Sequence, residues 1–260
     1  MRNVTIFVLG CLVWLAATAV PAAERGGFAL EFDGINDYVA IGDPVNTTGP
    51  LTLEAWVRVD GTGGRIVSNR HGSNGFELDV SGSQFRFTVN GSVLMAGSTT
   101  FDPGRWQHVA VTWAGPDTGE GWMFVDGEPV YNTVNPATMN DAAGNLMIGS
   151  MGAGSWHFHG AIDELRIFAT VVDPEDIRTW MHRRIASDHP DFANLRAAWT
   201  FEEGAGQVVH SVVGPSAFDG QLGNSPEEDD ADPTWIATGM VSTRSLTWGE
   251  LKAGFRPSMR

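Results

Sequence analysis

Apolar residues alternate with polar residues in short runs along most of the chain. The clearest runs cover residues 28–33, 51–60, 76–80, 85–89 and 109–113. A period of two places every second side chain on the same face, so each run predicts a strand with one buried face. Asn90-Gly91 follows the fourth run and Asp126-Gly127 follows residues 122–125. Both dipeptides favour the positive φ angles of tight hairpin turns, and many short strands at this spacing predict a two-sheet sandwich.

Only one segment has a clear helical pattern. Asp173-Pro174-Glu175-Asp176 combines a capping residue, a proline for the first turn and two acids for the positive end of a helix. Ile177, Trp180 and Met181 then share one face, so we predict a short helix near 174–184. Further strands are predicted at residues 195–201 and 235–236, and an exposed acidic loop at 224–233.

The first 22 residues have the pattern of a secretory signal peptide. Arg2 gives a positive start, an uncharged apolar stretch covers residues 4–20, and small residues continue to Ala22. A membrane anchor is the alternative, but the stretch is at the short limit for a bilayer, which takes about 20 residues. Cys11 ends a lipoprotein-like box, yet the apolar stretch continues beyond it. We therefore expect cleavage after Ala22, export, and no stable membrane insertion of the mature chain.

Composition narrows the range of partners. Cys11 is the only cysteine, so the mature chain can form no disulfide and no thiolate metal site. The formal net charge is −15, which argues against nucleic acid and against anionic membranes because both attract clustered Lys and Arg. An acidic exported chain does offer many carboxylates to calcium. The mature length, about 235 residues, suits a single large all-β domain.

Several motifs resemble those of bacterial laminin-G-like domains, in the same order along the chain. They are LEFDGINDYV at 30–39, WQHVAVTW at 106–113, WMFVDGE at 122–128 and GAIDELRIF at 160–168. The resemblance covers residues 28–185 and includes the predicted helix. It implies an all-β, concanavalin A-like jelly-roll sandwich of two antiparallel sheets with one short helix, the fold of pentraxins and legume-type lectins.

One further motif is out of place. Residues 198–206 resemble a stretch that often precedes the opening motif in this family, but here they come late. Either a truncated second domain begins there, or these strands fold back to complete the same sandwich. The remaining roughly 45 residues are too few for another sandwich, which favours the second interpretation. We predict a signal peptide at 1–22, one jelly-roll domain at 23–240, with 195–240 completing the sandwich, and a tail at 241–260.

The superfamily that the motifs resemble also contains glycoside hydrolases, which act through a pair of catalytic acids. Retaining enzymes need two carboxylates about 5 Å apart. By resemblance to the related glucanases, these would lie on one strand at positions i, i+2 and often i+4. Glu77 and Asp79 share a strand face, but position 81 is Ser. We interpret both acids as part of a solvated strand face and predict no catalytic residue.

Two patterns bear on metal binding. His157 and His159 form an H-x-H pair, a spacing that metal sites use, but no third ligand is identifiable nearby. We interpret them as exposed or hydrogen-bonded histidines at the end of a loop. The family resemblance implies a structural calcium between the first strand region and an aspartate on a late strand. That aspartate would be Asp163, with Asp33 or nearby carbonyls as partners. The alternative role for Asp163 is to accept hydrogen bonds from a neighbouring loop.

Tryptophan side chains are the best candidates for contact with a sugar, because exposed aromatic rings stack on sugar rings. Trp56 faces away from its apolar strand neighbours and is expected on an outer sheet face, whereas Trp156 lies in a loop. Trp113 and Trp199 are expected in the core. Four candidate ligand-binding residues result: Trp56, Trp156, His157 and His159.

These patterns together predict a secreted bacterial recognition module, extracellular or periplasmic, that binds an extracellular glycan and holds a structural calcium. A module for binding surface proteins is the alternative, and a divergent hydrolase acting through Glu77 and Asp79 is a third. An exposed aromatic groove would favour sugar, and a flat apolar patch of several hundred Å² would favour protein. A deep cleft with paired acids would favour the hydrolase.

Overall fold

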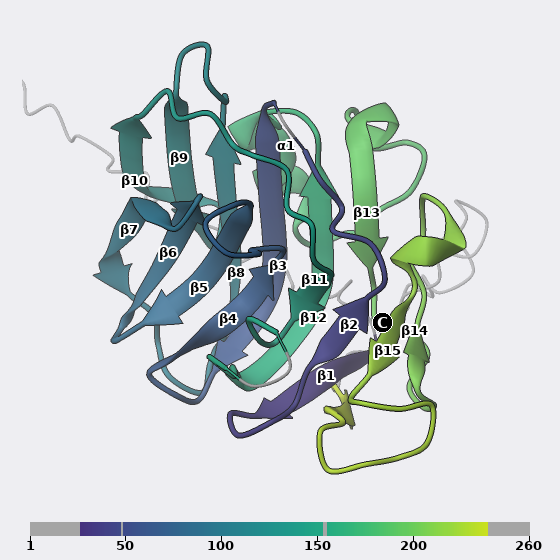
Figure 1. The fold of residues 1–260 in the computed structure, drawn as a ribbon. Coiled ribbons are helices and arrows are strands. Elements are labelled where there is room, and N and C mark those ends of the chain that lie inside the picture. Colours follow the sequence, from purple (N-terminus) through teal and green to yellow (C-terminus); the bar gives the residue numbers. More distant parts are fainter. Residues whose placement is uncertain (1–26, 48, 153–154, 239–260) are drawn as a thin grey trace, which may run out of the picture.

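The computed structural model describes residues 27–47, 49–152 and 155–238, so the predicted signal peptide and tail lie outside the described residues. Two antiparallel sheets of eight strands each face one another (Figure 1). Sheet A contains β1 (Phe28–Asp33), β3 (Leu51–Val59), β8 (Trp106–Trp113), β9 (Glu120–Val125), β10 (Glu128–Val134), β12 (His159–Phe168), β13 (Leu195–Trp199) and β16 (Thr234–Ala237). Sheet B contains β2 (Val39–Ile41), β4 (Gly63–Ser68), β5 (Phe76–Ser81), β6 (Gln84–Val89), β7 (Ser92–Thr100), β11 (Leu146–Ile148), β14 (Val208–Val209) and β15 (Gly220–Leu222). The predicted jelly-roll sandwich is confirmed.

The alternating runs and the hairpin turns lie where the sequence predicted them. Asn90 and Gly91 have φ angles of 48° and 76° and connect β6 to β7. Asp126 and Gly127 have φ angles of 51° and 78° and connect β9 to β10. Two consecutive positive φ angles are those of the type I′ turn, whose twist matches that of the strands it joins.

The main core fills the space between the sheets. Large apolar side chains from both inner faces meet there, and Trp113 and Trp199 are fully buried among them, as predicted. Trp113 packs against Phe87 of the opposite sheet, with ring centroids 6.4 Å apart. Burying a large apolar side chain stabilises a fold by about 1.5–3 kcal/mol, so this core provides the cohesion that the missing disulfides cannot.

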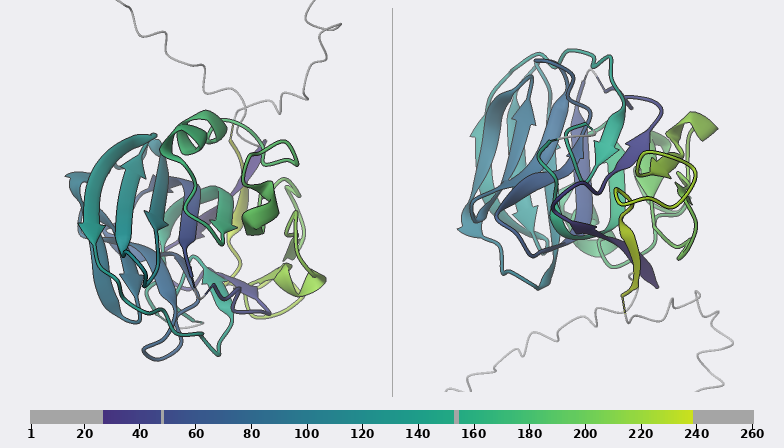
Figure 2. Two further views of the ribbon diagram at one scale, coloured as in Figure 1. Left: turned by 90° about the horizontal axis from the view of Figure 1, so that it is seen from above. Right: turned by 60° about the horizontal axis from the view of Figure 1, so that its bottom comes forward.

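A second layer covers the outer face of sheet A. It consists of α1 (Pro174–Trp180), the irregular segment after it, and a 3₁₀ helix at Phe192–Asn194, as Figures 1 and 2 show. Ile177 and Ile185 pack there against Phe124 and Phe168 of the sheet. No helix among the described residues is both long and apolar enough to span a bilayer.

Helix α1 begins as predicted and ends earlier than predicted. The Asp173 carboxylate accepts a hydrogen bond from the backbone N–H of Glu175, and Pro174 occupies the first turn. The helix ends at Trp180 and not near residue 184. Beyond it the chain turns so that its carbonyl groups reach sheet A, where the carbonyl of Met181 accepts a hydrogen bond from Nε1 of Trp56 at 2.6 Å.

A buried ionic cluster lies between this second layer and sheet A. Arg166 donates to Glu54 and to Glu164, both at 3.0 Å, and each of the three side chains is at most 3 % exposed. The same guanidinium donates to the carbonyl of Trp180 and to that of Arg183. Burial raises the pKa of both glutamates, and Arg166 opposes that rise. The cluster ties α1 and the chain after it to the sheet.

The last described strands belong to the same two sheets. β13 pairs with β12, β16 pairs with β1, and the β14–β15 hairpin extends sheet B next to β2. Residues 195–237 therefore add strands to both layers of the sandwich.

Candidate functional site

The outer face of sheet B is hollowed where β2, β11 and β4 lie side by side. Val39 and Ile41 of β2 point into the main core, so Ala40 points outward. Ala40 pairs with Met147 of β11, which pairs in turn with Ser68 of β4. These three positions form one row across the outer face, and the first two provide the apolar floor of a hollow.

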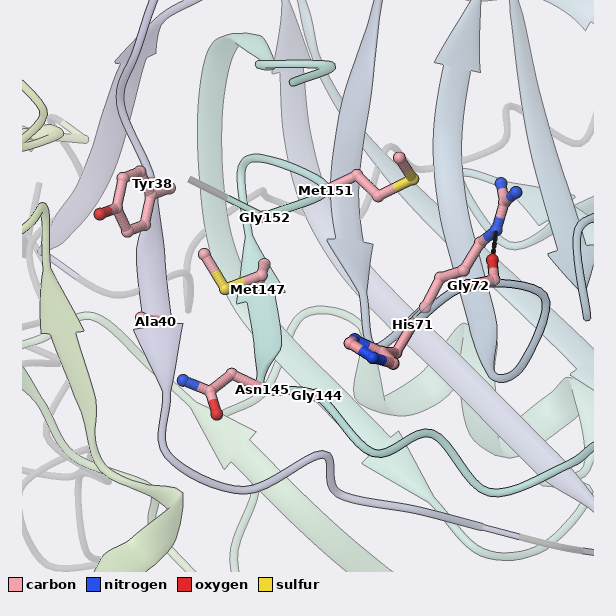
Figure 3. Close-up of a pocket in the computed structure, with 10 residues that line it drawn as sticks. Tyr38, Ala40, His71, Gly72, Gly144, Asn145, Met147, Met151 and Gly152 are labelled. Atoms are coloured by element: carbon pink, nitrogen blue, oxygen red, sulfur yellow. Dashed lines mark hydrogen bonds between the residues drawn. The ribbon is translucent and has the colours of Figure 1, made fainter. Parts of the chain in front are cut away.

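This hollow, which we call the basin, has a volume of about 530 Å³. That volume falls within the range of pockets that hold small ligands, about 300–1,000 Å³. Figure 3 shows Met147 projecting into it from β11 and Tyr38 from the residue just before β2, with Asn145 and His71 on the loops at its rim. The basin is lined by Tyr38, Ala40, Arg70, His71, Gly72, Gly144, Asn145, Met147, Met151 and Gly152.

Tyr38 closes one end of the basin. Its hydroxyl donates to the side-chain oxygen of Asn224 at 2.8 Å, and its ring packs with Met147 and Ala231. Only 5 % of Tyr38 is exposed, so this ring is a wall and not a stacking surface. The pKa of Tyr38 is raised by burial and by the nearby Asp229 and Asp232.

Arg70 and His71 form the opposite wall. The Nε of Arg70 donates to the carbonyl of Gly72 at 3.0 Å, and its Nη1 pairs with Glu77 at 3.1 Å. These contacts hold the guanidinium in place while 27 % of the side chain stays exposed. His71 is exposed and follows β4 in the turn that leads to β5.

Glu77 and Asp79 lie on the same outer face as the basin, but the prediction of a solvated strand face is wrong. The two side chains are 1 % and 0 % exposed, because arginines cover them. Glu77 pairs with Arg65 at 2.7 Å, and Asp79 pairs with Arg86 at 2.8 Å. Burial raises the pKa of Asp79, while Arg65 and Arg86 oppose that rise. Each carboxylate is thus engaged by a guanidinium and does not flank an open cleft.

Trp156 is the most exposed tryptophan side chain among the described residues, at 58 %. The guanidinium of Arg65 lies 4.8 Å from the centre of its ring, and its carbonyl accepts the N–H of Arg65 at 2.9 Å. Trp156 therefore lies over the arginine cluster on the basin side of sheet B, and it belongs to the same loop as Met151. Its φ of 60° is a rare backbone conformation for a bulky residue.

The prediction that Trp56 is accessible on an outer sheet face is wrong. Trp56 does point away from the main core, but it is only 4 % exposed, because the segment after α1 covers it. Its ring packs against His108 and His182. The contact with Met181 joins residues 125 positions apart. Trp56 anchors the second layer and is not available to a ligand.

The structure does not bring the two predicted calcium ligands, Asp33 and Asp163, together. Asp33 of β1 pairs with His159 of β12, four positions before Asp163. At about 3.3 Å per residue this places the two aspartates about 13 Å apart, too far to share an ion. Asp163 is fully buried, and its Oδ1 accepts a hydrogen bond from the N–H of Glu164 at 2.8 Å.

Asp33 instead lies in a separate acidic cleft of about 360 Å³, lined by Glu31, Phe32, Asp33, Asp37, Asp60, His159 and Thr234. Asp37 accepts a hydrogen bond from the backbone N–H of Asp33 at 2.7 Å, and Nδ1 of His157 lies 3.2 Å from the carbonyl of Asp37. His159 is exposed, and neither histidine lines the basin. Within the described part of the chain, no group of three His, Cys, Asp or Glu side chains is arranged to hold a metal ion.

Asp37 makes the stability of the fold depend on pH. Burial, together with repulsion from Asp33, Asp230 and Asp232, raises the pKa of Asp37 from 3.8 to about 6. The folded state therefore holds this proton more tightly than the unfolded state, and stability falls as the pH rises from 3.8 to 6. In EDTA at pH 7.5, Asp37→Asn should raise the midpoint of thermal unfolding by about 2–4 °C, and the gain should vanish at pH 3.5.

Asp102→Asn is the matched control, since Asp102 is exposed and pairs only with surface Arg105. An equal gain at both pH values would contradict a charge effect at Asp37. A calcium ion bound in the cleft would reverse the result when calcium replaces EDTA, because Asp37→Asn would then remove one of its ligands.

Two facing antiparallel sheets of eight strands each define a jelly-roll sandwich. A family model described as the concanavalin A-like lectin/glucanases superfamily matches residues 33–178. The match spans more than half of the chain, and the chain belongs to this superfamily. The match ends before β13, so it does not include the late strands that complete both sheets.

The chain is similar to several known proteins at low sequence identity. The rat (Rattus norvegicus) Sushi, von Willebrand factor type A, EGF and pentraxin domain-containing protein 1 is 26 % identical over 175 residues, which are 60 % of this chain and 5 % of that protein. A crystal structure from Bacteroides ovatus, provisionally assigned as a carbohydrate-binding protein, has a TM-score of 0.63 and 17 % identity, covering 84 % of this chain and 62 % of that one. The CBM40 module of the Ruminococcus gnavus IT-sialidase, bound to α2,3-sialyllactose, has a TM-score of 0.49 and 14 % identity, covering 58 % and 95 %.

Sequence reasoning missed every residue of the basin. Met147 occurs in a short strand, Tyr38 immediately precedes another, and Arg70, His71 and Asn145 occur between strands, without any shared motif. Pairing of β2 with β11 and of β11 with β4 brings them together. The alternation around Tyr38 and Ala40 could have indicated an outward face, but not what else lies on it.

Proposed function

We propose that this protein is a non-catalytic module that binds a glycan in the basin on the outer face of sheet B. The basin itself carries the proposal. Its floor is apolar, from Ala40 and Met147, and its rim offers hydrogen-bonding groups from His71 and Asn145. A pocket that combines apolar surface with a few convergent polar groups is suited to a sugar, whose rings have apolar faces and polar edges.

Trp156 is the residue on this side of the sheet that can stack on a further sugar ring. Its exposed indole is held over Arg65, and its φ of 60° is strained for a bulky side chain. Strained backbone conformations persist only where the surrounding structure holds them, and they are concentrated at binding and active sites. Two tryptophans were predicted to stack on a sugar, Trp56 and Trp156. Because the segment after α1 covers Trp56, we assign this role to Trp156.

The state of the carboxylates supports binding without catalysis. A retaining hydrolase needs one carboxylate free to attack and one able to give up a proton. Glu77 and Asp79 are instead held by Arg65, Arg70 and Arg86. The structure gives less support to a protein partner, since exposed Trp122 and Tyr131 occupy successive positions of the β9–β10 pairing and face opposite sides of it.

None of the described residues that line the basin is acidic, so the proposal includes no calcium ion in contact with the glycan there. We therefore expect EDTA to leave glycan affinity unchanged. The predicted signal peptide places this binding outside the cytoplasm, in the extracellular medium or the periplasm, and this location is part of the proposal.

The test is a panel of immobilised polysaccharides and oligosaccharides, read by direct binding and then by calorimetry, with the mature protein. Trp156→Ala should weaken binding of a recognised glycan about five- to tenfold, since loss of one stacking ring removes about 1–1.5 kcal/mol. Trp122→Ala is the matched control, because Trp122 is 43 % exposed but lies on sheet A. Absence of binding to any glycan, or equal losses in the two variants, would reject the proposal.

A further inference from the structure

We propose that the glycan recognised in the basin is anionic and carries carboxylate or sulfate groups, with its negative group at the wall formed by Arg70 and His71. This inference rests on the proposed function and names the class of ligand for the same site.

The charge of the ionic cluster beside the basin differs in sign from that of the whole protein. The chain carries a formal net charge of −15. The ionic cluster beside the basin instead combines three arginines, Arg65, Arg70 and Arg86, with two acids, Glu77 and Asp79. Three positive charges against two negative ones leave a net charge of +1. A positive site on an acidic protein provides electrostatic complementarity to an anion where the rest of the surface repels it.

Arg70 is the arginine of this cluster that reaches the basin. Its contacts with Gly72 and Glu77 fix the guanidinium, so little rotamer freedom remains to be lost when a ligand binds. Fixed guanidinium groups recognise planar carboxylates and sulfates through paired N–H donors. His71 continues the wall beside it, and a Cβ placed on Gly144 would lie only 3.0 Å from Nδ1 of His71. The small residue at 144 therefore leaves room for the imidazole at the rim.

The far end of the basin, at Tyr38, is electrostatically negative. Beyond Tyr38 lies the loop that contains Asn224, Asp229 and Asp232, and the negative charges of the two aspartates act on the Tyr38 hydroxyl. An anionic group is repelled at that end and attracted at the Arg70 end. The basin thus has an electrostatic direction, which orients an acidic sugar as well as selecting it.

The experiment compares acidic glycans with neutral counterparts on the mature protein. Polygalacturonate and a sulfated galactan are the acidic probes, and methyl-esterified polygalacturonate and unsulfated galactan are the neutral ones. We expect at least one acidic glycan to bind tenfold or more tightly than its neutral counterpart. A preference for the carboxylate or the sulfate form identifies which anion the wall accepts.

Two substitutions with opposite expected effects test the role of the wall. Arg70→Gln should lower affinity for the acidic glycan about tenfold, whereas Glu77→Gln should raise it severalfold because it removes a neighbouring negative charge. Both effects should be larger for the acidic glycan than for its neutral counterpart, because only the acidic glycan carries a charge at this wall. Arg178→Gln is the control, since this partly exposed arginine lies on α1, on the sheet A side.

The dependence on salt tests the inference without any substitution. Raising NaCl from about 50 to 500 mM should weaken binding of the acidic glycan several-fold through screening and leave a neutral glycan unaffected. Equal affinity for acidic and neutral glycans, or no salt dependence, would overturn the anionic specificity while leaving glycan binding intact. Failure to bind any glycan would instead remove the proposed function together with this inference.

Discussion

Replacing Arg166 by methionine should destabilise the fold by about 3–5 kcal/mol, measured as the free energy of unfolding in urea at pH 7.5. Arg166 is 1 % exposed and neutralises both Glu54 and Glu164. Methionine fills a similar volume but leaves two buried carboxylates without their cation. It also removes the donors that reach the carbonyls of Trp180 and Arg183, so the second layer loses part of its attachment to sheet A.

The cause of this loss can be separated from simple packing. Arg166→Met combined with Glu54→Gln and Glu164→Gln should recover much of the stability, because no unpaired charge then remains buried. The single variant should also approach the native protein as the pH falls. Burial already raises the pKa of both glutamates, and without Arg166 that rise is larger, so protonation at acidic pH relieves the variant more. A triple variant no more stable than the single one would refute the ionic explanation.

Gly160→Ala should be the second severe substitution, with a loss of at least about 3 kcal/mol or failure to fold at 37 °C. Gly160 has a φ of 146°, and a Cβ placed there would lie 1.9 Å from the carbonyl oxygen of Arg58 on the neighbouring strand. The alanine methyl can be accommodated only if β12 and β3 separate at the centre of sheet A. The measurement is urea unfolding followed by tryptophan fluorescence.

Gly82→Ala is the matched control for this substitution. Gly82 also has a positive φ, 62°, but nothing lies within 4 Å of the position of an added Cβ. Only backbone strain should act there, and it should lower the free energy of unfolding by about 1 kcal/mol. Similar losses at the two positions would mean that strain, and not the collision with Arg58, explains the requirement for glycine at 160.

Local features of the sequence predicted local features of the fold. Asn90-Gly91 and Asp126-Gly127 determine their turns through backbone conformation alone, and Asp173 with Pro174 begins α1 in the same way. The end of α1 could not be predicted, because it depends on contacts with a strand more than a hundred residues earlier. Elements determined by their own residues were predicted correctly, and those determined by distant partners were not.

The same limit explains the outcome for the candidate site. The alternation correctly placed Trp56 on the outer side of its strand, but the segment that buries it lies elsewhere in the chain. Glu77 and Asp79 were correctly placed on one face, yet their arginine partners come from three different segments. Trp156 kept its predicted exposure because it lies in a loop. A linear pattern gives the direction of a side chain, whereas tertiary structure decides what covers it.

The pairing of β1 with β16 has a mechanical consequence. Phe28 lies opposite Ala237 in this antiparallel pair, so the first and last described strands enter and leave sheet A at the same point. The hydrogen bonds between antiparallel strands run perpendicular to the strands. A force that pulls these two strand ends apart is therefore directed along the bonds and breaks them one after another, starting at the pulled end. Under tension β16 would peel away first, while the strands that carry the basin belong to the other sheet and bear the load last.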